Sequence, residues 1–373
     1  MNLDFTEEQK MLRDQARSFL SDKSPLSTNK RILESDEPFD RELWQQVVGL
    51  GWTATTIPEK YGGLGLGHLE LCVMAEELGR RLAPTPFSSS VYLATEALLR
   101  YGSEAQKEKY LPGLADGSLI GSMALVESAG DLSADKIQSV LTGDTLRGSK
   151  VMVPDGTVAD FLVVLAKGKD GLSLALVDTK HDSVQTRLMN SVDDSRGHAR
   201  VIFADTPAEL LGGAGDGAAL TEDLLNRAAV LFAFEQVGGS EAAMEMSRNF
   251  AMERYTFGRP IGSYQAVKHK IAWMYVRNVL AKSNCYYAAW ALSTDAPELP
   301  AAAATARVSA IEAFRYASEE NIETHGGNGF TWEFDCHLFY RRSKLLSVNL
   351  GSHLVWKQKL MDRLLADESI AAV

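Results

Sequence analysis

Apolar residues recur at helical spacing through the first third of the chain. The first such stripe consists of Leu12, Ala16, Phe19 and Leu20. Thr6 precedes this stripe as a helix cap, with Gln9 three positions later, which is the spacing of a capping box. We predict further helices over about 43–50 and after the glycine-rich turn at 57–65. The helical region is expected to stop at Pro112 and the glycine after it, because proline removes a backbone donor.

From about Ser122 the apolar period changes from that of helices to that of strands. Short alternating or β-branched runs separated by Gly, Asp and Asn occur at 151–153, 161–165, 172–177 and 199–203. They predict a small antiparallel sheet or barrel. After Gly212 helical spacing returns in long, alanine-rich segments, which is typical of a helical bundle. We therefore predict a mainly α fold with a central β domain. The expected regions are a helical domain at 1–117, a β-barrel at 118–213 and a helical bundle at 214–373.

Composition narrows the class of protein. The chain has 373 residues, of which 45% are hydrophobic, and this length suffices for two or three packed units. The net charge of −11 disfavours nucleic acid as a partner, although a local basic pocket can still bind an anion. The three cysteines lack metal-site spacing, and no apolar run reaches the length of a membrane span. Together with an acidic N-terminus unlike a signal peptide, these features predict a soluble, cytoplasmic protein.

Two short segments in the C-terminal region carry the most specific signal. The first reads Arg-Tyr-Thr-Phe-Gly-Arg-Pro-Ile-Gly from Arg254 and continues to Gln265; the second reads His-Gly-Gly-Asn-Gly-Phe-Thr-Trp-Glu from His325. In this order, and on helices, they resemble the C-terminal half of acyl-CoA dehydrogenases. Those flavin enzymes introduce a double bond between the α and β carbons of a CoA thioester. The turn at 57–65 and the run Glu-Glu-Leu-Gly-Arg at 76–80 resemble the family's N-terminal domain, so the resemblance covers nearly the whole chain.

The resemblance implies a set of residues that contact FAD across a subunit boundary. In this family each chain lends such residues to the flavin of its neighbour. The matching positions here are Arg254, Phe257, Gln265, Glu323, Gly326 and Gly327. Arg254 would form forked, charge-assisted bonds to the pyrophosphate, and the glycine pair would let the backbone approach the cofactor. Glu323 departs from the family's usual Gln, and an acid beside a pyrophosphate is unfavourable unless it turns away or bonds the ribose hydroxyls.

The resemblance also implies that the catalytic base is missing. The family usually carries it as the glutamate of a Tyr-Glu-Gly-Thr tetrapeptide. The corresponding stretch here, 349–352, reads Asn-Leu-Gly-Ser, so Leu350 stands at the base position. Some members place the base on an earlier helix, one residue before an Arg, and Ala228 falls at that position here. Both positions are apolar.

The segments of the central domain that contact the flavin ring in this family are altered here as well. Family members have a stretch resembling Thr-Glu-Pro-X-Ala-Gly-Ser-Asp, whereas 126–132 here reads Val-Glu-Ser-Ala-Gly-Asp-Leu. The family's Trp-Ile-Thr-Asn strand end is replaced by Met-Val-Pro-Asp at 152–155, and Pro154 has neither a hydroxyl nor an N–H to donate.

These observations lead to one hypothesis and two alternatives. The hypothesis is the non-catalytic, cofactor-sharing subunit of a heteromeric acyl-CoA dehydrogenase of α₂β₂ type, as in members associated with bulky substrates such as steroid side-chain CoA esters. The implied partners are FAD, an acyl-CoA substrate, a homologous subunit and an electron-transfer flavoprotein-type acceptor. One alternative is a self-sufficient homomeric enzyme with a relocated base at Glu235, which lies among apolar residues of a helix. The other is a structural subunit without flavin.

Two further residue groups are expected to be structural. His325 is expected to pack in the core or at an interface rather than to catalyse. The basic cluster of Arg341, Arg342 and Lys344 is expected on a solvated helix face, with contact to an acidic partner surface as the alternative.

Overall fold

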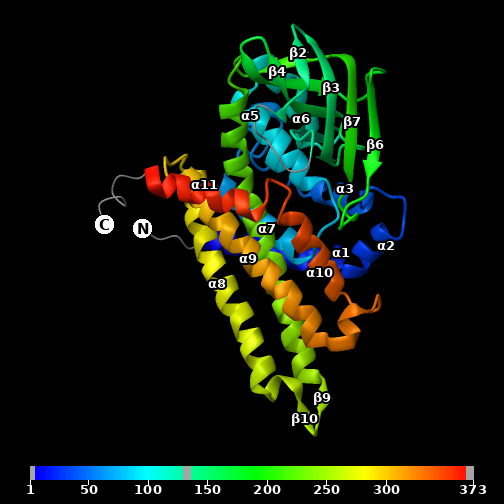
Figure 1. Cartoon of the computed structure of the whole chain (residues 1–373), viewed down its shortest axis with the longest axis vertical. Coiled ribbons are helices and arrows are strands. Elements are labelled where there is room, and N and C mark those ends of the chain that lie inside the picture. The colour runs from blue at the N-terminus through cyan, green and yellow to red at the C-terminus, as the bar shows by residue number, and fades with distance from the viewer. Residues whose placement is uncertain (1–4, 129–135, 367–373) are drawn as a thin grey trace. The chain divides into compact units, whose positions relative to one another are not determined.

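The computed structural model describes residues 5–128 and 136–366, which form two compact bodies (Figure 1). The first body comprises the described residues within 1–29, 68–83 and 229–373, and the second comprises those within 30–67 and 84–228. Each body combines segments that are far apart in the sequence. The bodies therefore do not follow the three consecutive regions expected above, and those boundaries stay a prediction about the sequence alone.

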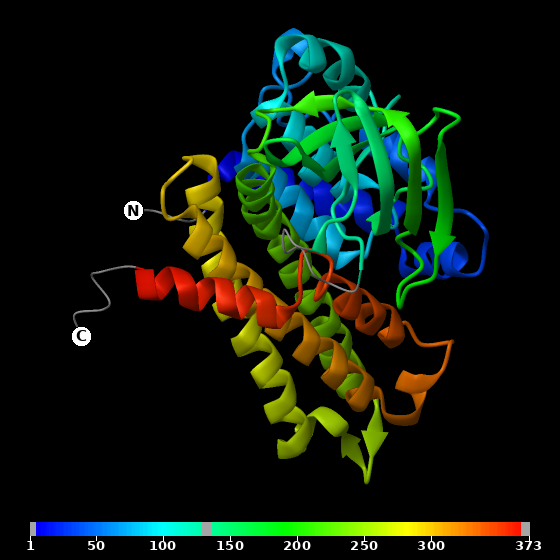
Figure 2. The same ribbon diagram turned by 45° about the horizontal axis from the view of Figure 1, so that its top comes forward.

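The first body is built from helices. They are α1 (Glu7–Lys23), α4 (His68–Arg80), most of α7 (Gly217–Glu253), α8 (Gln265–Ser293), α9 (Leu299–His325), α10 (Cys336–Leu346) and α11 (His353–Ala366), while α2 (Leu26–Leu33) begins here. Helix α11 packs against α9, as the view in Figure 2 shows. The predicted capping box is confirmed, because Gln9 N donates to Thr6 Oγ1 and Thr6 N donates to Gln9 Oε1. No helix among the described residues is long and apolar enough to cross a membrane.

Helices α4 and α7 touch backbone to backbone. A Cβ added to Gly79 would lie 2.0 Å from the carbonyl oxygen of Glu235, and a Cβ added to Gly238 would lie 2.0 Å from that of Glu76. Each helix therefore carries a glycine where the other helix presents a carbonyl. No other residue type fits these two positions without moving the helices apart.

A network of ion pairs surrounds this crossing. Lys282 of α8 contacts the buried Glu76 of α4 at 2.5 Å, and Arg17 of α1 binds the buried Glu77 at 2.7 Å. Arg80 of α4 binds two carboxylates of α7, at 3.1 Å to Glu241 and 2.6 Å to Glu245. A buried carboxylate is stable only when it is paired, so these cations hold α1, α7 and α8 against α4.

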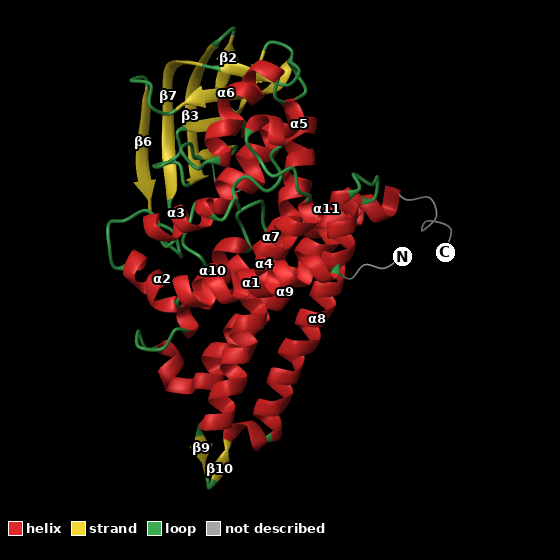
Figure 3. Cartoon of the chain, turned by 180° about the vertical axis from the view of Figure 1, so that it is seen from behind, coloured by secondary structure: helices red, strands yellow, loops and turns green. Residues whose placement is uncertain are grey.

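The second body contains the sheet (Figure 3). Its helical elements are α3 (Arg41–Gly49), η1 (Glu59–Tyr61), the π-helix η2 (Ser88–Thr95), α5 (Glu96–Tyr101) and α6 (Glu104–Ala115). Its strands are β1 (Gly121–Ala124), β2 (Val140–Thr142), β3 (Thr145–Pro154), β4 (Phe161–Gly168), β5 (Gly171–Asp178), β6 (Val184–Met189), β7 (His198–Pro207) and β8 (Glu209–Leu211). The four runs predicted as strands lie in β3, β4, β5 and β7, and the mainly α fold class with a central β domain is confirmed.

The sheet has the order β6-β7-β3-β2-β4-β5-β8, with β1 paired to β4. Most neighbouring strands run antiparallel, but β1 and β2 both pair with β4 in parallel. The prediction of an antiparallel sheet or barrel was therefore wrong for these two pairs, and the sheet is mixed. The alternation of apolar residues identifies strands, whereas their relative direction depends on connections outside those runs.

The predicted helix stop at Pro112 was also wrong. Helix α6 continues through Pro112 to Ala115. The residues on either side, Leu111 and Leu114, are buried, and the hydroxyl of Thr53 donates to the carbonyl oxygen of Ala115 at 2.8 Å. Tertiary packing outweighs the loss of one hydrogen bond near the helix end.

Gly79→Ala is predicted to destabilise the first body, because its Cβ collides with the backbone of α7. We expect a loss of about 1–3 kcal/mol in unfolding free energy, measured by denaturant unfolding. Gly49→Ala is the matched control, because a Cβ at Gly49 of α3 meets nothing within 4 Å. An equal effect of both substitutions would contradict the close crossing.

Candidate functional site

Three helix ends meet at one end of the first body. Helix α7 ends at Glu253, α8 begins at Gln265 and α9 ends at His325. The ring of Phe250 on α7 stacks on the ring of His325, with centroids 4.1 Å apart. The residues that the resemblance selected, Arg254, Phe257, Gln265, Glu323, Gly326 and Gly327, all lie on or directly after these helix ends. The fold thus gathers segments that are about seventy residues apart in the sequence.

A short hairpin at this end presents Phe257. Strands β9 (Tyr255–Thr256) and β10 (Arg259–Pro260) are joined by Phe257 and Gly258, whose φ angles are 52° and 78°. Two positive φ values in a two-residue loop are those of a type I′ turn, in which a phenylalanine is strained. The Phe257 side chain is 92% exposed, so no packing within the chain compensates for the strain. Strain of this kind points to a function outside the chain.

Arg254 and Gln265 are exposed beside the hairpin. The backbone carbonyl of Arg254 accepts a hydrogen bond from Ile261 N at 2.8 Å, which ties the hairpin to η4 (Ile261–Ser263). Within the described residues the Arg254 side chain has neither an ion pair nor a hydrogen bond, so a pair with Glu253 does not form. The first turn of α8 has no side-chain cap, which leaves its N–H groups available to an anion.

Glu323 is paired with a lysine that the sequence analysis did not single out. Lys270 of α8 forms an ion pair with Glu323 and a second with Glu320 at 2.8 Å. Hydrogen bonds to these two carboxylates raise the pKa of Lys270. The cation offsets the charge that made Glu323 unfavourable beside a pyrophosphate. Only the packing of α8 against α9 shows this pairing, since Lys270 and Glu323 are far apart in the sequence.

The glycine pair of η5 (Gly326–Phe330) borders open space. Gly326 adopts φ 60° and ψ −135°, a backbone conformation that is accessible only to glycine. A Cβ added to Gly326 or Gly327 would meet no atom within 4 Å. The chain's own packing therefore does not require Gly327, and its exposed backbone is accessible to another molecule.

The position of the expected base lies in a closed loop. Leu350 is only 6% exposed, and its carbonyl oxygen accepts a hydrogen bond from Trp356 Nε1 at 3.1 Å. The buried guanidinium of Arg307 donates to the carbonyl oxygen of Leu346 and to Asn349 Oδ1. These bonds fix the loop around a side chain that can neither accept nor donate a proton.

Glu235 lies beside a buried cation. It is 1% exposed on α7, and Arg307 of α9 is fully buried and donates to the neighbouring Gln236 Oε1 at 2.7 Å. Burial lowers the pKa of Arg307 to about 9, while the negative charge of Glu235 acts in the opposite direction. This geometry is that of a counter-ion in the core. The role of Glu235 as a relocated base stays a hypothesis.

In the second body, polar groups at and just after the end of β3 form hydrogen bonds with other segments of the same body. Met152 has φ 51° at a bulge and is 39% exposed. The carbonyl oxygen of Pro154 accepts a hydrogen bond from Ser122 Oγ at 2.5 Å, and the buried Asp155 carboxylate accepts one from Ser89 Oγ at 2.5 Å. Pro154 contributes no donor here, as the sequence analysis expected from its chemistry.

Glu127 anchors the neighbouring loop. Its carboxylate binds the buried Lys150 at 2.7 Å and accepts the backbone N–H of Gln138 at 2.6 Å. Of the altered stretch at 126–132, residues 129–132 lie outside the described residues, and the prediction that this stretch has lost its flavin contacts stays untested.

The basic cluster on α10 is not a solvated face, which corrects that expectation. Arg342 is 1% exposed and donates to the carbonyl oxygen of Leu82 at 3.1 Å. Lys344 is partly exposed and pairs with Glu319 at 2.8 Å. The burial of Arg342 could not be predicted from the sequence pattern, because most arginines are exposed and a buried one has the same residue type.

Both the N-terminal and the C-terminal part of the chain match known protein families. Residues 6–118 match the acyl-CoA dehydrogenase N-terminal domain, and residues 215–365 match the acyl-CoA dehydrogenase C-terminal domain. Acyl-CoA dehydrogenase IpdE2 of Mycobacterium tuberculosis is 31% identical over 340 residues, which cover 90% of this chain and 91% of that protein.

Solved structures are similar along the whole chain. A chain of the Tcur3481–Tcur3483 steroid ACAD aligns with a TM-score of 0.88 and 30% identity, covering 97% of this chain and 99% of that one. A chain of the ChsE4–ChsE5 complex from Mycobacterium tuberculosis aligns with a TM-score of 0.89 and 26% identity, covering 98% and 99%. The chain belongs to the acyl-CoA dehydrogenase family, a class of FAD-dependent oxidoreductases.

Phe257→Asn is predicted to leave the protein as stable as the wild type or to stabilise it by about 0.5–1 kcal/mol. Asparagine tolerates the left-handed backbone of a type I′ turn, and the exposed phenylalanine ring contributes no packing. Denaturant unfolding of the two proteins measures the difference. A loss of more than about 1 kcal/mol would show that the ring stabilises its own chain.

The stability of the first body is predicted to fall in acid partly through His325. Burial of the ring lowers the pKa of His325, and its Nδ1–H donates to the carbonyl oxygen of Asn321 at 2.8 Å. A lowered pKa means that the neutral ring stabilises the fold above the unfolded value near 6.5, and this contribution is lost as pH falls below it. Unfolding free energies between about pH 5 and pH 8 should depend less on pH in His325→Gln than in the wild type.

Proposed function

We propose that this chain is the non-catalytic, cofactor-sharing subunit of a hetero-oligomeric, FAD-dependent acyl-CoA dehydrogenase of α₂β₂ type. A homologous partner chain supplies the base, the flavin wall and the acyl pocket. One observation carries the proposal. The exposed side chains of Arg254 and Phe257 have no ion pair, hydrogen bond or ring contact within the described residues, whereas Leu350 occupies the base position inside a closed loop.

The reaction explains why this asymmetry matters. Desaturation requires removal of a weakly acidic proton from Cα and transfer of a hydride from Cβ, and FAD supplies the hydride acceptor. A positioned base contributes about 10²–10⁴ in rate. Leu350 and Ala228 cannot act as a base, and Glu235 lies against the Arg307 cation in the core. A carboxylate from another chain therefore takes this role.

The exposed cluster fits the adenosine and pyrophosphate end of FAD. Arg254 offers an unpaired guanidinium, whose fork matches phosphate oxygens. Phe257 offers a flat apolar face, and Gln265 a neutral hydrogen-bonding group at a helix N-terminus. Gly326 and Gly327 leave room for a close approach. These features support the lending role, while Met152 and Pro154 of the second body offer little to a flavin ring.

The relatives suggest a substrate class. The similar solved structures include a steroid ACAD and a complex of two differently named chains, ChsE4 and ChsE5. We infer a bulky acyl-CoA, such as a steroid side-chain CoA ester, as the substrate of the assembled enzyme. We also infer an electron-transfer flavoprotein-type acceptor.

The test is to purify the chain alone and together with a homologous acyl-CoA dehydrogenase chain encoded near it. We expect little flavin in the chain alone, and a yellow, active complex with fewer flavins than chains. A yellow, active homo-oligomer of this chain would refute the proposal. In that case Glu235→Gln tests the relocated base, since loss of activity with flavin retained would identify it. A yellow, active complex whose flavin content does not change in Arg254→Ala would instead favour the structural subunit without flavin.

Arg254→Ala is predicted to weaken flavin binding by the complex about 10- to 100-fold, because a charge-assisted bond to phosphate is lost. Flavin retained after gel filtration measures the effect. Arg248→Ala is the matched control, because Arg248 is exposed near the end of α7, six residues before Arg254, and among the described residues its guanidinium bonds only the neighbouring Asn249. Equal flavin content in both variants would mean that Arg254 does not contact the cofactor.

A further inference from the structure

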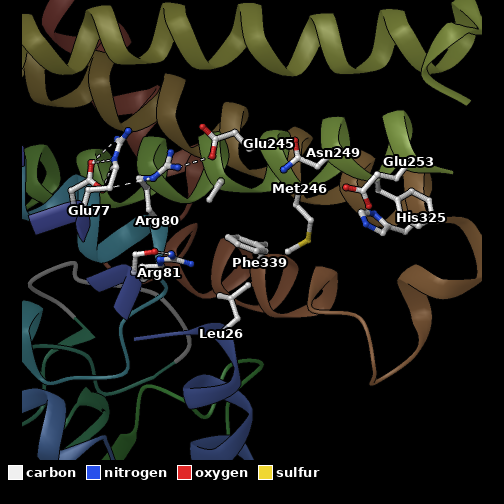
Figure 4. Close-up of a pocket in the computed structure, with 14 residues that line it drawn as sticks. Leu26, Glu77, Arg80, Arg81, Glu245, Met246, Asn249, Glu253, His325 and Phe339 are labelled. Atoms are coloured by element: carbon white, nitrogen blue, oxygen red, sulfur yellow. Dashed lines mark hydrogen bonds and ion pairs between the residues drawn. The ribbon is translucent and has the colours of Figure 1, made fainter. Parts of the chain in front are cut away.

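The first body contains a cavity that does not include the residues expected to contact FAD. Its volume is about 510 Å³, within the usual range of small-molecule pockets (Figure 4). The lining comes from α1, α4, α7, α9 and α10, with Leu26 at one side. All of these residues belong to the same compact body. Along α7 the lining runs from Ala242 to Glu253, a length of about 16 Å at 1.5 Å per residue.

One end of the cavity carries an arginine that forms no ion pair with a carboxylate among the described residues. Arg17 is paired with Glu77 at 2.7 Å, and Arg80 is paired with both Glu241 and Glu245, so these two cations are already bound to carboxylates. Arg81 also lines this end, and the only hydrogen-bond partner of its guanidinium among the described residues is the hydroxyl of Ser21. A half-buried guanidinium without a carboxylate is a binding site for an anion.

The middle of the cavity is apolar. Met246 and Phe250 of α7, Phe339 of α10 and Leu26 face it. Figure 4 shows Phe339, Met246 and Leu26 between the arginine end and His325. This part favours a hydrocarbon body over a second charged group.

The opposite end carries a hydrogen-bond acceptor. His325 is 6% exposed and donates Nδ1–H to the carbonyl oxygen of Asn321, so Nε2 of the neutral ring has a free lone pair. Within the described residues Nε2 has no partner. Asn249 and Glu253 also line this end, and the amide nitrogen of Asn249 can donate while the Glu253 carboxylate accepts. A ligand hydroxyl satisfies both kinds of group.

We propose that this cavity binds an amphipathic hydroxycarboxylate, with its carboxylate on Arg81, its hydrocarbon body along Met246 and Phe339, and its hydroxyl on His325. The site is separate from the flavin-lending residues and does not depend on the proposed subunit role. A carboxylate fits the arginine fork better than a single-oxygen head does. Along the cavity Arg81 comes first, then the apolar residues, then His325, so the ligand carries its carboxylate at one end and its hydroxyl at the other.

Titration calorimetry of the protein with ω-hydroxydodecanoate tests the site. We expect saturable binding, with dodecanoate binding more weakly because it lacks the hydroxyl, and dodecanol more weakly still because it lacks the anion. Arg81→Gln should weaken binding of ω-hydroxydodecanoate about 10- to 100-fold. Arg248→Gln, an exposed arginine outside the cavity, should leave it unchanged. Absence of saturable binding, or equal affinity in both variants, would overturn the proposal.

Two further variants keep the test decisive. Arg81→Lys retains the charge but not the fork, and we expect it to bind between the wild type and Arg81→Gln; it replaces Arg81→Gln should that variant fail to fold. His325→Phe should bring the affinity for ω-hydroxydodecanoate down to that for dodecanoate. A preference for the hydroxylated probe that survives His325→Phe would contradict the assigned orientation. Tighter binding of dodecyl phosphate than of either carboxylate would contradict the assigned head group.

Discussion

The backbone contact between α4 and α7 is the constraint on which the first body depends. Gly79 and Gly238 allow the two helices to touch, and this contact buries Glu76 and Glu77. Buried carboxylates need cations, which Arg17 and Lys282 supply from α1 and α8. The two glycines at this crossing therefore bury the carboxylates that require Arg17 on α1 and Lys282 on α8. It also fixes α7, whose far end carries the hairpin with Phe257.

Charge in this body serves two different purposes. In the core, Arg307 donates hydrogen bonds to Leu346 and Asn349, in the loop that contains Leu350. The negative charge of Glu235 offsets the positive charge of Arg307. This network maintains the structure, because the Arg307 guanidinium donates to three acceptors, which are Gln236 Oε1, the carbonyl oxygen of Leu346 and Asn349 Oδ1. At the helix ends the opposite holds, since Arg254 has no partner within the described chain. The Arg307 guanidinium is thus bound within the core, whereas the Arg254 guanidinium at the helix end is exposed.

Sequence patterns predicted features that depend on near neighbours. The Thr6 cap and the strand runs belong to this kind. The features that were missed depend on contacts between distant segments. The parallel pairing of β1 and β2 with β4, the pairing of Glu323 with Lys270 and the burial of Arg342 have no local signature. The resemblance to a family selected the residues at the helix ends, but only the fold showed that they lie together in open space.

Residues that line the proposed cavity are direct sequence neighbours of residues proposed to contact the flavin. Glu253 lines the cavity and precedes Arg254, and His325 lines it and precedes Gly326. The Phe250–His325 stack connects the two helix ends between them. A ligand that bonds His325 would therefore restrain the ends of α7 and α9 at the points where the hairpin and the Gly-Gly turn begin. Because ordering these segments costs conformational entropy when a flavin binds, a ligand that has already ordered them reduces that cost. Occupancy of one site would then favour occupancy of the other without any change in the residues that contact the flavin.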